Sequence, residues 1–176
     1  RLSSHFALGL QAERVMPIAK HFPGHGDASG DSHFVAASSP LTRDEVMSKD
    51  LAPYLALSAA LEKPWGIMLA HVSFPKIDPS KMPATFSSVI VQGLLRKELG
   101  DDVLVVTDDI QMAGASTESD IGNRSVRAIE AGADMVMIAW SLKVQKQVFS
   151  AIRKAIDTGR LKPERIRQSL RRIELA

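Results

Sequence analysis

The sequence lacks cysteine altogether, so no disulfide bond and no cysteine-based metal site can form. Cysteine usage therefore leaves the cellular compartment open. Long apolar runs are missing too, because the longest, such as DMVMIAW at 134–140, fall far short of the ~20 residues of a membrane-spanning helix. A large excess of one charge is also absent, since the formal net charge is +2. We accordingly predict no membrane span and no nucleic-acid partner.

The chain also lacks an initiator methionine and a signal peptide. It begins with RLSSHF and ends with RRIELA inside a helical pattern. We therefore expect residues 1–176 to be one partial domain, truncated at both ends, with enough apolar residues for a buried core. We expect a cytoplasmic location, with secretion or lipid anchoring as alternatives that depend on the missing N-terminus.

Four short runs are typical of β-strands, and the last three are nearly continuous apolar runs that favour a parallel sheet covered on both faces. These runs span 14–20, 65–72, 102–108 and 133–140. Helical patterns follow them at 41–63, 87–100, 122–134, 143–159 and 162–175. The alternation predicts an α/β fold of about four βα units. A doubly wound sheet and half of a (β/α)₈ barrel both fit, since a whole barrel needs about 250 residues.

Local signals delimit several of these helices. Thr42 and Glu45 have the spacing of a capping box, and Pro53 predicts a kink or a split in the helix at 41–63. Gly100 predicts the end of the helix at 87–100. The basic stretch RLKPERIRQSLRRIE at 160–174 alternates with apolar residues, which favours a solvated helix face over a nucleic-acid site.

Polar residues gather where the predicted strands end. Lys20 and His21 follow the first strand, His71 ends the second, Asp108 ends the third and Trp140 ends the fourth. Parallel α/β folds place their active sites at the carboxyl ends of the strands. We therefore expect a catalytic site at this end of the sheet.

The stretch VVTDDIQM at 105–112 offers two candidate carboxylates. A rigid, partly desolvated Asp108 can act as a nucleophile, a metal ligand or a general base, whereas the alternative reading is a helix cap. Because adjacent residues of a strand point in opposite directions, we expect one aspartate in the site and its neighbour Asp109 in a supporting hydrogen bond.

The stretch KHFPGHGDASGDSH at 20–33 holds three of the five histidines. His21 and His25 are four residues apart, but the intervening Pro-Gly pair argues against a helix, so no metal site is predicted. We expect the bond between Phe22 and Pro23 to be cis. Asp31 lies two residues before His33 and can orient its ring for proton transfer, although the composition taken alone favours a polar turn.

These stretches, together with AHVSFP at 70–75 and AIEAGADMVMI at 128–138, closely resemble family 3 glycoside hydrolases. Within that family they are similar to the bacterial β-N-acetylglucosaminidases of peptidoglycan recycling. The resemblance covers nearly the whole chain and implies the C-terminal half of the (β/α)₈ catalytic barrel. It also implies that the family's earlier barrel strands, which carry a sugar-binding aspartate and arginine, precede this segment.

The resemblance implies a retaining mechanism that needs no cofactor or metal. It assigns Asp108 as the nucleophile that forms a covalent glycosyl-enzyme, and His33 as the general acid/base paired with Asp31. Lys20 and His21 are expected to bind sugar hydroxyls, and His71 is expected to line the site. The implied substrate is a muropeptide or oligosaccharide with a terminal β-linked N-acetylglucosamine.

Three other functions remain open, and the last of them is a metal hydrolase, which bound zinc would support. A glycoside phosphorylase would use the same site with phosphate as acceptor, because a histidine that has given up its proton repels phosphate less than a carboxylate does. An inactive half barrel could instead serve as a binding or assembly module. Against that, Lys20, His21, Asp31, His33 and Asp108 are all present.

Overall fold

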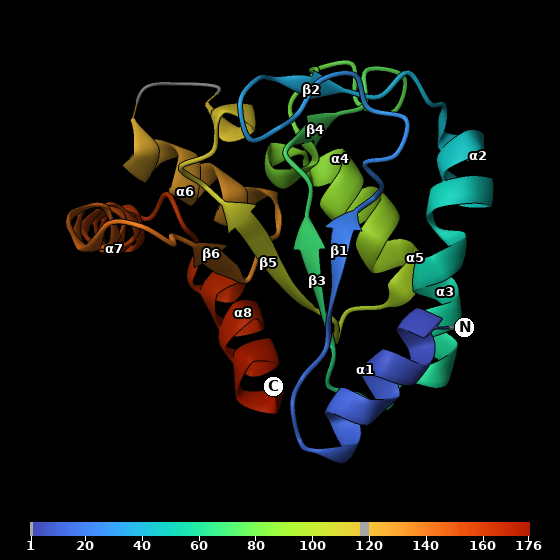
Figure 1. Cartoon of the computed structure of the whole chain (residues 1–176). Helices are drawn as coiled ribbons and strands as arrows, with labels where there is room; N and C mark the ends of the chain where they lie inside the picture. The colour runs from blue at the N-terminus through green and yellow to red at the C-terminus, as the bar shows by residue number, and fades with distance from the viewer. Residues whose placement is uncertain (1, 117–119) are drawn as a thin grey trace.

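Four parallel strands form the main sheet of the computed structural model, which describes residues 2–116 and 120–176. In sheet order they are β1 (Ile18–Phe22), β3 (Gly66–Leu69), β5 (Leu104–Asp109) and β6 (Met135–Met137). Neighbours in the sheet follow chain order, as in a barrel, and the order does not reverse as in a doubly wound sheet. In Figure 1 the arrows of β1, β3 and β5 point to the same upper end, where the connecting loops gather.

The helices that follow the strands are close to those predicted. The capping box is confirmed: Thr42 Oγ1 accepts the Glu45 N–H at 3.3 Å, and Glu45 Oε2 accepts the Thr42 N–H at 2.8 Å. The helix expected at 41–63 is divided, with Pro53 in the first turn of its last part. Its parts are α2 (Arg43–Glu45), the π-helical η1 (Val46–Asp50) and α3 (Ala52–Ala60).

The next helix, expected at 87–100, also carries a π-helical middle and ends at Gly100, whose φ of 92° suits glycine. It comprises α4 (Ser88–Ile90), η3 (Val91–Arg96) and α5 (Lys97–Leu99). The later helices match the sequence patterns and are α6 (Ile121–Ala131), α7 (Leu142–Asp157) and α8 (Pro163–Leu175).

Several elements lack a clear periodic signal in the sequence. One is the helix α1 (Leu2–Ala12), which precedes β1 and contacts α3. Two very short strands, β2 (Ala37–Ser38) and β4 (Val72–Ser73), pair beyond the carboxyl ends of the main strands. Two single 3₁₀ turns complete the described chain, η2 (Ala84–Phe86) and η4 (Ala113–Ala115).

The first strand lies further along the chain than the pattern at 14–20 predicts. Pairing starts at Ile18, opposite Gly66, and Pro17 contributes only its carbonyl, which accepts the Gly66 N–H at 2.9 Å. A proline has no N–H to give to a ladder, so the strand begins after it. The prediction that Lys20 and His21 follow the strand was therefore wrong, because both belong to β1.

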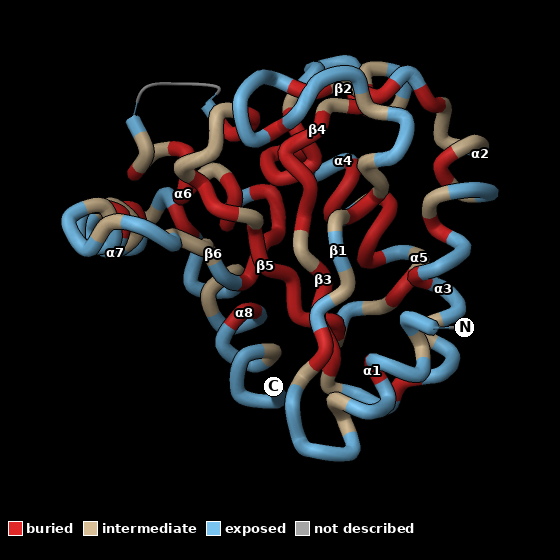
Figure 2. The backbone as a smooth tube through the Cα atoms, viewed as in Figure 1, coloured by how far each residue is buried: buried red, intermediate tan, exposed pale blue. Residues whose placement is uncertain are grey.

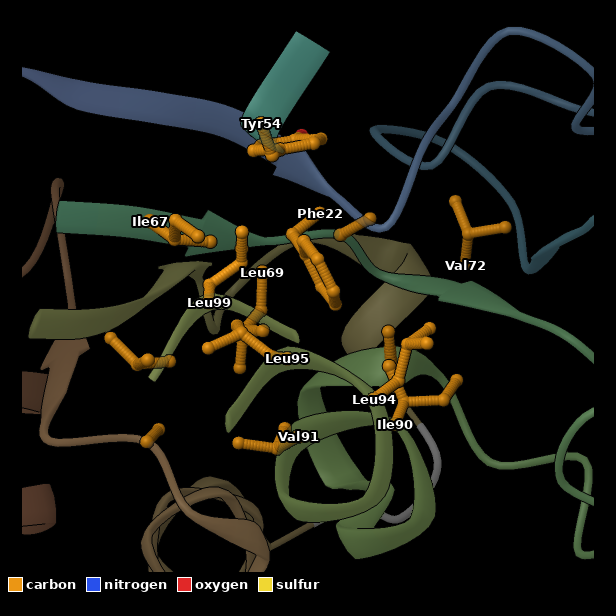
Figure 3. Close-up of a cluster of buried hydrophobic side chains, with 14 of the residues drawn as sticks. Phe22, Tyr54, Ile67, Leu69, Val72, Ile90, Val91, Leu94, Leu95 and Leu99 are labelled. Carbon is orange, nitrogen blue, oxygen red and sulfur yellow. The ribbon is translucent and has the colours of Figure 1, made fainter. Parts of the chain in front are cut away.

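The main core lies between the sheet and the helix made of α4, η3 and α5. Phe22, Leu69 and Leu95 are fully buried there, and the Phe22 ring meets the Tyr54 ring edge-on with centroids 5.3 Å apart (Figure 3). Residues along β3 and β5 are mostly buried, whereas the loop that crosses the upper end is mostly exposed (Figure 2). This core fixes the strand ends rigidly beneath a more exposed layer of loops.

The sheet has two open edges, as expected for half a barrel. Within the described residues, β1 and β6 each pair along one side only, and Ile18 and Met135 are 40% and 44% exposed. Such edges offer unpaired backbone groups and apolar side chains to another segment.

The basic face of α8 differs from the prediction of a solvated surface. Arg167 and Arg171 are indeed exposed, but Arg165 and Arg172 are largely buried against the carboxylate of Asp134. The prediction was wrong for these two residues because helical periodicity does not reveal a buried acid elsewhere in the chain, here just before β6.

Candidate active site

Asp108 lies at the carboxyl end of β5, and its side chain is partly exposed. Its Oδ2 lies 3.4 Å from His21 Nε2, and its Oδ1 accepts the Asp109 N–H at 2.8 Å. Burial by itself would raise the pKa of the Asp108 carboxyl, but the hydrogen bonds from His21 and from the Asp109 backbone outweigh it and lower the pKa to about 2. Its side chain is 14% exposed, so an ionised oxygen stays within reach of a ligand.

Asp109 points away from the site, as strand geometry predicts. It is buried, and its Oδ1 accepts the Gln111 N–H at 3.0 Å, which shapes the turn after β5. Its carbonyl oxygen contacts His71 Nε2 at 3.1 Å. Asp109 thus holds the strand end in place, while the Asp108 side chain stays partly exposed.

His71 lies beneath this strand end and is almost completely buried. Its Nδ1 lies 2.8 Å from Thr85 Oγ1, a hydroxyl that also donates to the Ala70 carbonyl at 3.1 Å. Burial lowers the pKa of the His71 imidazole. Both ring nitrogens contact protein atoms, so in this structure His71 braces the site floor. Its expected contact with a sugar stays a prediction.

The end of β1 brings Lys20 and His21 to the same end of the sheet. The Lys20–His21 and Phe22–Pro23 peptide bonds are both cis, which confirms the prediction for Phe22–Pro23. Lys20 is exposed and His21 is partly buried against Asp108. His25 follows on the loop, its ring edge-on to that of His21 with centroids 6.1 Å apart.

Asp31 and His33 lie on the long loop between β1 and β2. Asp31 Oδ1 accepts the backbone N–H of His33 at 2.9 Å, so the two residues meet through the backbone here and not through the ring. Both residues are exposed. Between them the carbonyl of Ser32 accepts the Gly114 N–H at 2.9 Å, and Gly114 lies just after β5. This contact places the loop at the same end of the sheet as Asp108.

Several residues of this site escaped the sequence patterns. No periodic or spacing signal marks Thr85, Ser32 or Gly114. The spacing of His25 from His21 bears only on metal ligation. Their contacts join segments that lie far apart in the chain, which a local pattern does not report. Trp140, expected at the end of the fourth strand, lies three residues beyond β6 and is exposed.

No group of three histidine or acidic side chains among residues 2–116 and 120–176 is arranged to hold an ion. Nor does any helix in that part of the chain have the length and apolarity to cross a membrane.

Comparison with known proteins finds a matching family model and similar sequences. Residues 1–175 match the family model described as the glycosyl hydrolase family 3 N terminal domain. A β-hexosaminidase of Idiomarina loihiensis is 38% identical over 138 residues, which cover 78% of this chain and 40% of that protein. The chain thus spans less than half the length of this curated relative.

Solved structures are similar over nearly the whole chain. A family 3 β-N-acetylglucosaminidase from Paenibacillus sp. str. FPU-7 has a TM-score of 0.90 and 39% identity, over 96% of this chain and 32% of that one. A β-glucoside phosphorylase, BglX, has a TM-score of 0.82 and 27% identity, over 97% of this chain and 31% of that one.

Proposed function

We propose, from the premise that the chain belongs to glycosyl hydrolase family 3, that it supplies the catalytic residues of a retaining β-N-acetylglucosaminidase. The observation that carries the proposal is the Asp108 carboxylate, ionised and partly exposed at the end of β5. The similarity to proteins named β-hexosaminidase and β-N-acetylglucosaminidase supports the sugar specificity.

In the first step Asp108 attacks the anomeric carbon and forms a covalent glycosyl-enzyme. The bond to the leaving oxygen breaks, and His33 gives its proton to that oxygen. In the second step His33 takes a proton from water, which attacks the same carbon and releases Asp108. Retention follows from these two displacements.

His33 replaces the carboxylic acid that most retaining glycosidases use. An imidazole suits both steps because histidine in general titrates near neutral pH. Asp31, two residues earlier, accepts the His33 backbone N–H and is proposed to orient His33. The Asp31–His33 backbone contact and the tie between Ser32 and Gly114 support this assignment, since they keep the pair at the end of the sheet where Asp108 lies.

Lys20 and His21 are proposed to bind sugar hydroxyls, because both belong to the end of β1 and His21 lies 3.4 Å from Asp108. His71 is proposed to line the floor of the site. The proposed substrates are peptidoglycan fragments with a terminal N-acetylglucosamine, acted on in the cytoplasm.

The test compares two substrates with the full-length protein as its gene encodes it. His33→Ala should lower kcat/KM by about 100-fold or more for a disaccharide, whose leaving group needs a proton, but far less for a dinitrophenyl glycoside. Mass spectrometry of the slow His33→Ala variant should find N-acetylglucosamine bound to the peptide containing Asp108. Equal losses on both substrates would rule out the acid role.

A glycoside phosphorylase is the second candidate, favoured by the structural similarity to BglX. Incubation of the disaccharide in phosphate buffer separates the two. N-acetylglucosamine 1-phosphate would identify a phosphorylase, whereas free N-acetylglucosamine alone would identify a hydrolase.

A further inference from the structure

The loop that carries Asp31 and His33 has one buried residue. From Gly24 to Ala36 every residue is exposed or partly exposed except Ser32, which is 3% exposed. The loop holds Gly26 and Gly30 and begins and ends at buried residues, Pro23 and Ala37. Ser32 is thus the interior anchor of the loop, and it lies directly between the two residues of the proposed proton-transfer pair.

The Ser32 side chain is held from the β1 side of the site. Its hydroxyl lies 2.9 Å from His25 Nε2, and the His25 ring in turn contacts the ring of His21. His21 is the residue next to the carboxylate of Asp108. A continuous series of contacts therefore runs from the nucleophile through two histidines to the loop.

The Ser32 backbone is held from the other side, by the turn after β5. Its carbonyl accepts the Gly114 N–H at 2.9 Å. A Cβ at Gly114 would lie 2.9 Å from that carbonyl oxygen and 3.0 Å from the His71 carbonyl oxygen, both of them backbone atoms that yield little. Only glycine lets the three segments approach this closely.

We infer that Ser32 is a positioning residue for proton transfer: its hydroxyl on His25 and its carbonyl on Gly114 fix the loop so that Asp31 and His33 are presented to the Asp108 site. The inference rests on the proposed function. Ser32 is 3% exposed and its hydroxyl contacts His25, so its proposed role is on the loop and not on the substrate. It acts by restricting the backbone on which the acid/base is carried, and small misplacements of such groups are costly.

Ser32→Ala in the full-length protein removes the hydroxyl with little change in volume. Loss of one hydrogen bond corresponds to about a 3- to 10-fold effect. We expect kcat/KM to fall by that factor for the disaccharide and by less than about twofold for the dinitrophenyl glycoside, whose departure needs no acid. A general loosening of the fold would instead lower both rates alike.

Two further variants locate the effect in the bond to His25. His25→Ala should reproduce the selective loss, and the double variant with Ser32→Ala should lose no more than either single variant, because both remove the same hydrogen bond. His25→Gln should restore disaccharide cleavage, since its amide can occupy the place of Nε2. If Ser32→Ala does not fold, His25→Ala tests the same bond from a partly exposed residue.

Ser29→Ala is the matched control. Ser29 lies on the same loop, is exposed, and donates to the Ser38 carbonyl at 3.1 Å. It should leave both rates unchanged.

Parallel measurements on His33→Ala show whether a negative result overturns the positioning role of Ser32 or the proposed acid role of His33. If His33→Ala shows the dependence on leaving group but Ser32→Ala loses equally on both substrates, or loses nothing, the positioning role alone is overturned. If His33→Ala shows no such dependence, the proposed acid is overturned and the inference falls with it.

Discussion

Asp108 lies at the carboxyl end of β5, and Asp134 lies just before the start of the neighbouring strand β6. Nitrogen atoms of cationic or imidazole side chains lie close to both carboxylates. The Asp134 side chain is fully buried. Its oxygens accept hydrogen bonds from Arg96 at 2.8 Å, Ser169 at 2.8 Å, Arg172 at 3.0 Å, the Val105 N–H at 3.0 Å and Arg165 at 3.2 Å. Asp108 has two such neighbours and keeps exposed surface.

The difference shows how one residue type serves structure or chemistry. Asp134 has every acceptor position occupied, so it joins α8 and η3 to the start of β6 and has no capacity left for a ligand. Asp108 has its charge stabilised by His21 but remains open on one side. An ionised carboxylate with a free acceptor position can react with a ligand. One whose acceptor positions are all occupied can only stabilise the fold.

Asp108→Asn should give the largest effect. Without the nucleophile, turnover of N-acetylglucosaminides should fall by at least ~10⁴-fold, because the covalent step is lost. The variant should still fold, as its circular dichroism spectrum would show, although it loses the stability that the ionised carboxylate contributes. A variant with more than about 1% of wild-type activity on the disaccharide would contradict the assignment.

Asp134→Asn should lower stability and leave activity unchanged, whereas Asp108→Asn chiefly abolishes activity. Three buried guanidinium groups lose their counter-charge, so the free energy of unfolding should fall by about 3–5 kcal/mol, measured by urea denaturation. The activity per folded molecule should stay unchanged. Asp102→Asn is the control, because Asp102 pairs with Lys63 in an exposed ion pair and its loss should have a far smaller effect.

His21→Ala should leave the ionised Asp108 carboxylate less well stabilised and so test what distinguishes it from Asp134. Removing the His21 hydrogen bond raises the pKa of the Asp108 carboxyl, so the acid side of the kcat/KM profile should move to higher pH. His21→Gln keeps a donor and should shift it less. An acid limb identical to that of wild type would show that His21 does not set the charge of Asp108.

The smallest effect concerns stability in acid. The pKa of Asp108 is lowered to about 2 in the fold, below its ordinary value near 3.9. The ionised Asp108 therefore contributes fully to the free energy of unfolding above its ordinary pKa. This contribution is lost as pH falls towards 2. Wild type should lose stability over this range relative to Asp108→Asn. Parallel unfolding curves for the two proteins from pH 4 to pH 2 would contradict the lowered pKa.

The sequence patterns predicted much of the fold because they report on neighbours in the chain. Apolar runs identified β3 and β5, the Thr42–Glu45 spacing identified a helix start, and Gly100 identified a helix end. The same patterns misplaced β1 by several residues, since the register opposite Gly66 depends on a partner about fifty residues away. They also offered no sign that η1 and η3 would be π-helical.

The same distinction applies to the candidate site, where the sequence predicted some features and not others. The positions of Asp108 and His21 at one end of the sheet followed from strand polarity. The burial of His71 between Thr85 and Asp109 did not, because it depends on how two loops pack.

The sequence by itself determined most of the strands and helices, that the strands run parallel, and which end of the sheet carries the polar groups. Each of these depends on the alternation of side chains within a few positions. Only the tertiary structure decided that Asp134 is saturated by arginines from two helices, and that Ser32 is buried between His25 and Gly114. Those contacts join residues that packing alone brings together, so no local pattern encodes them.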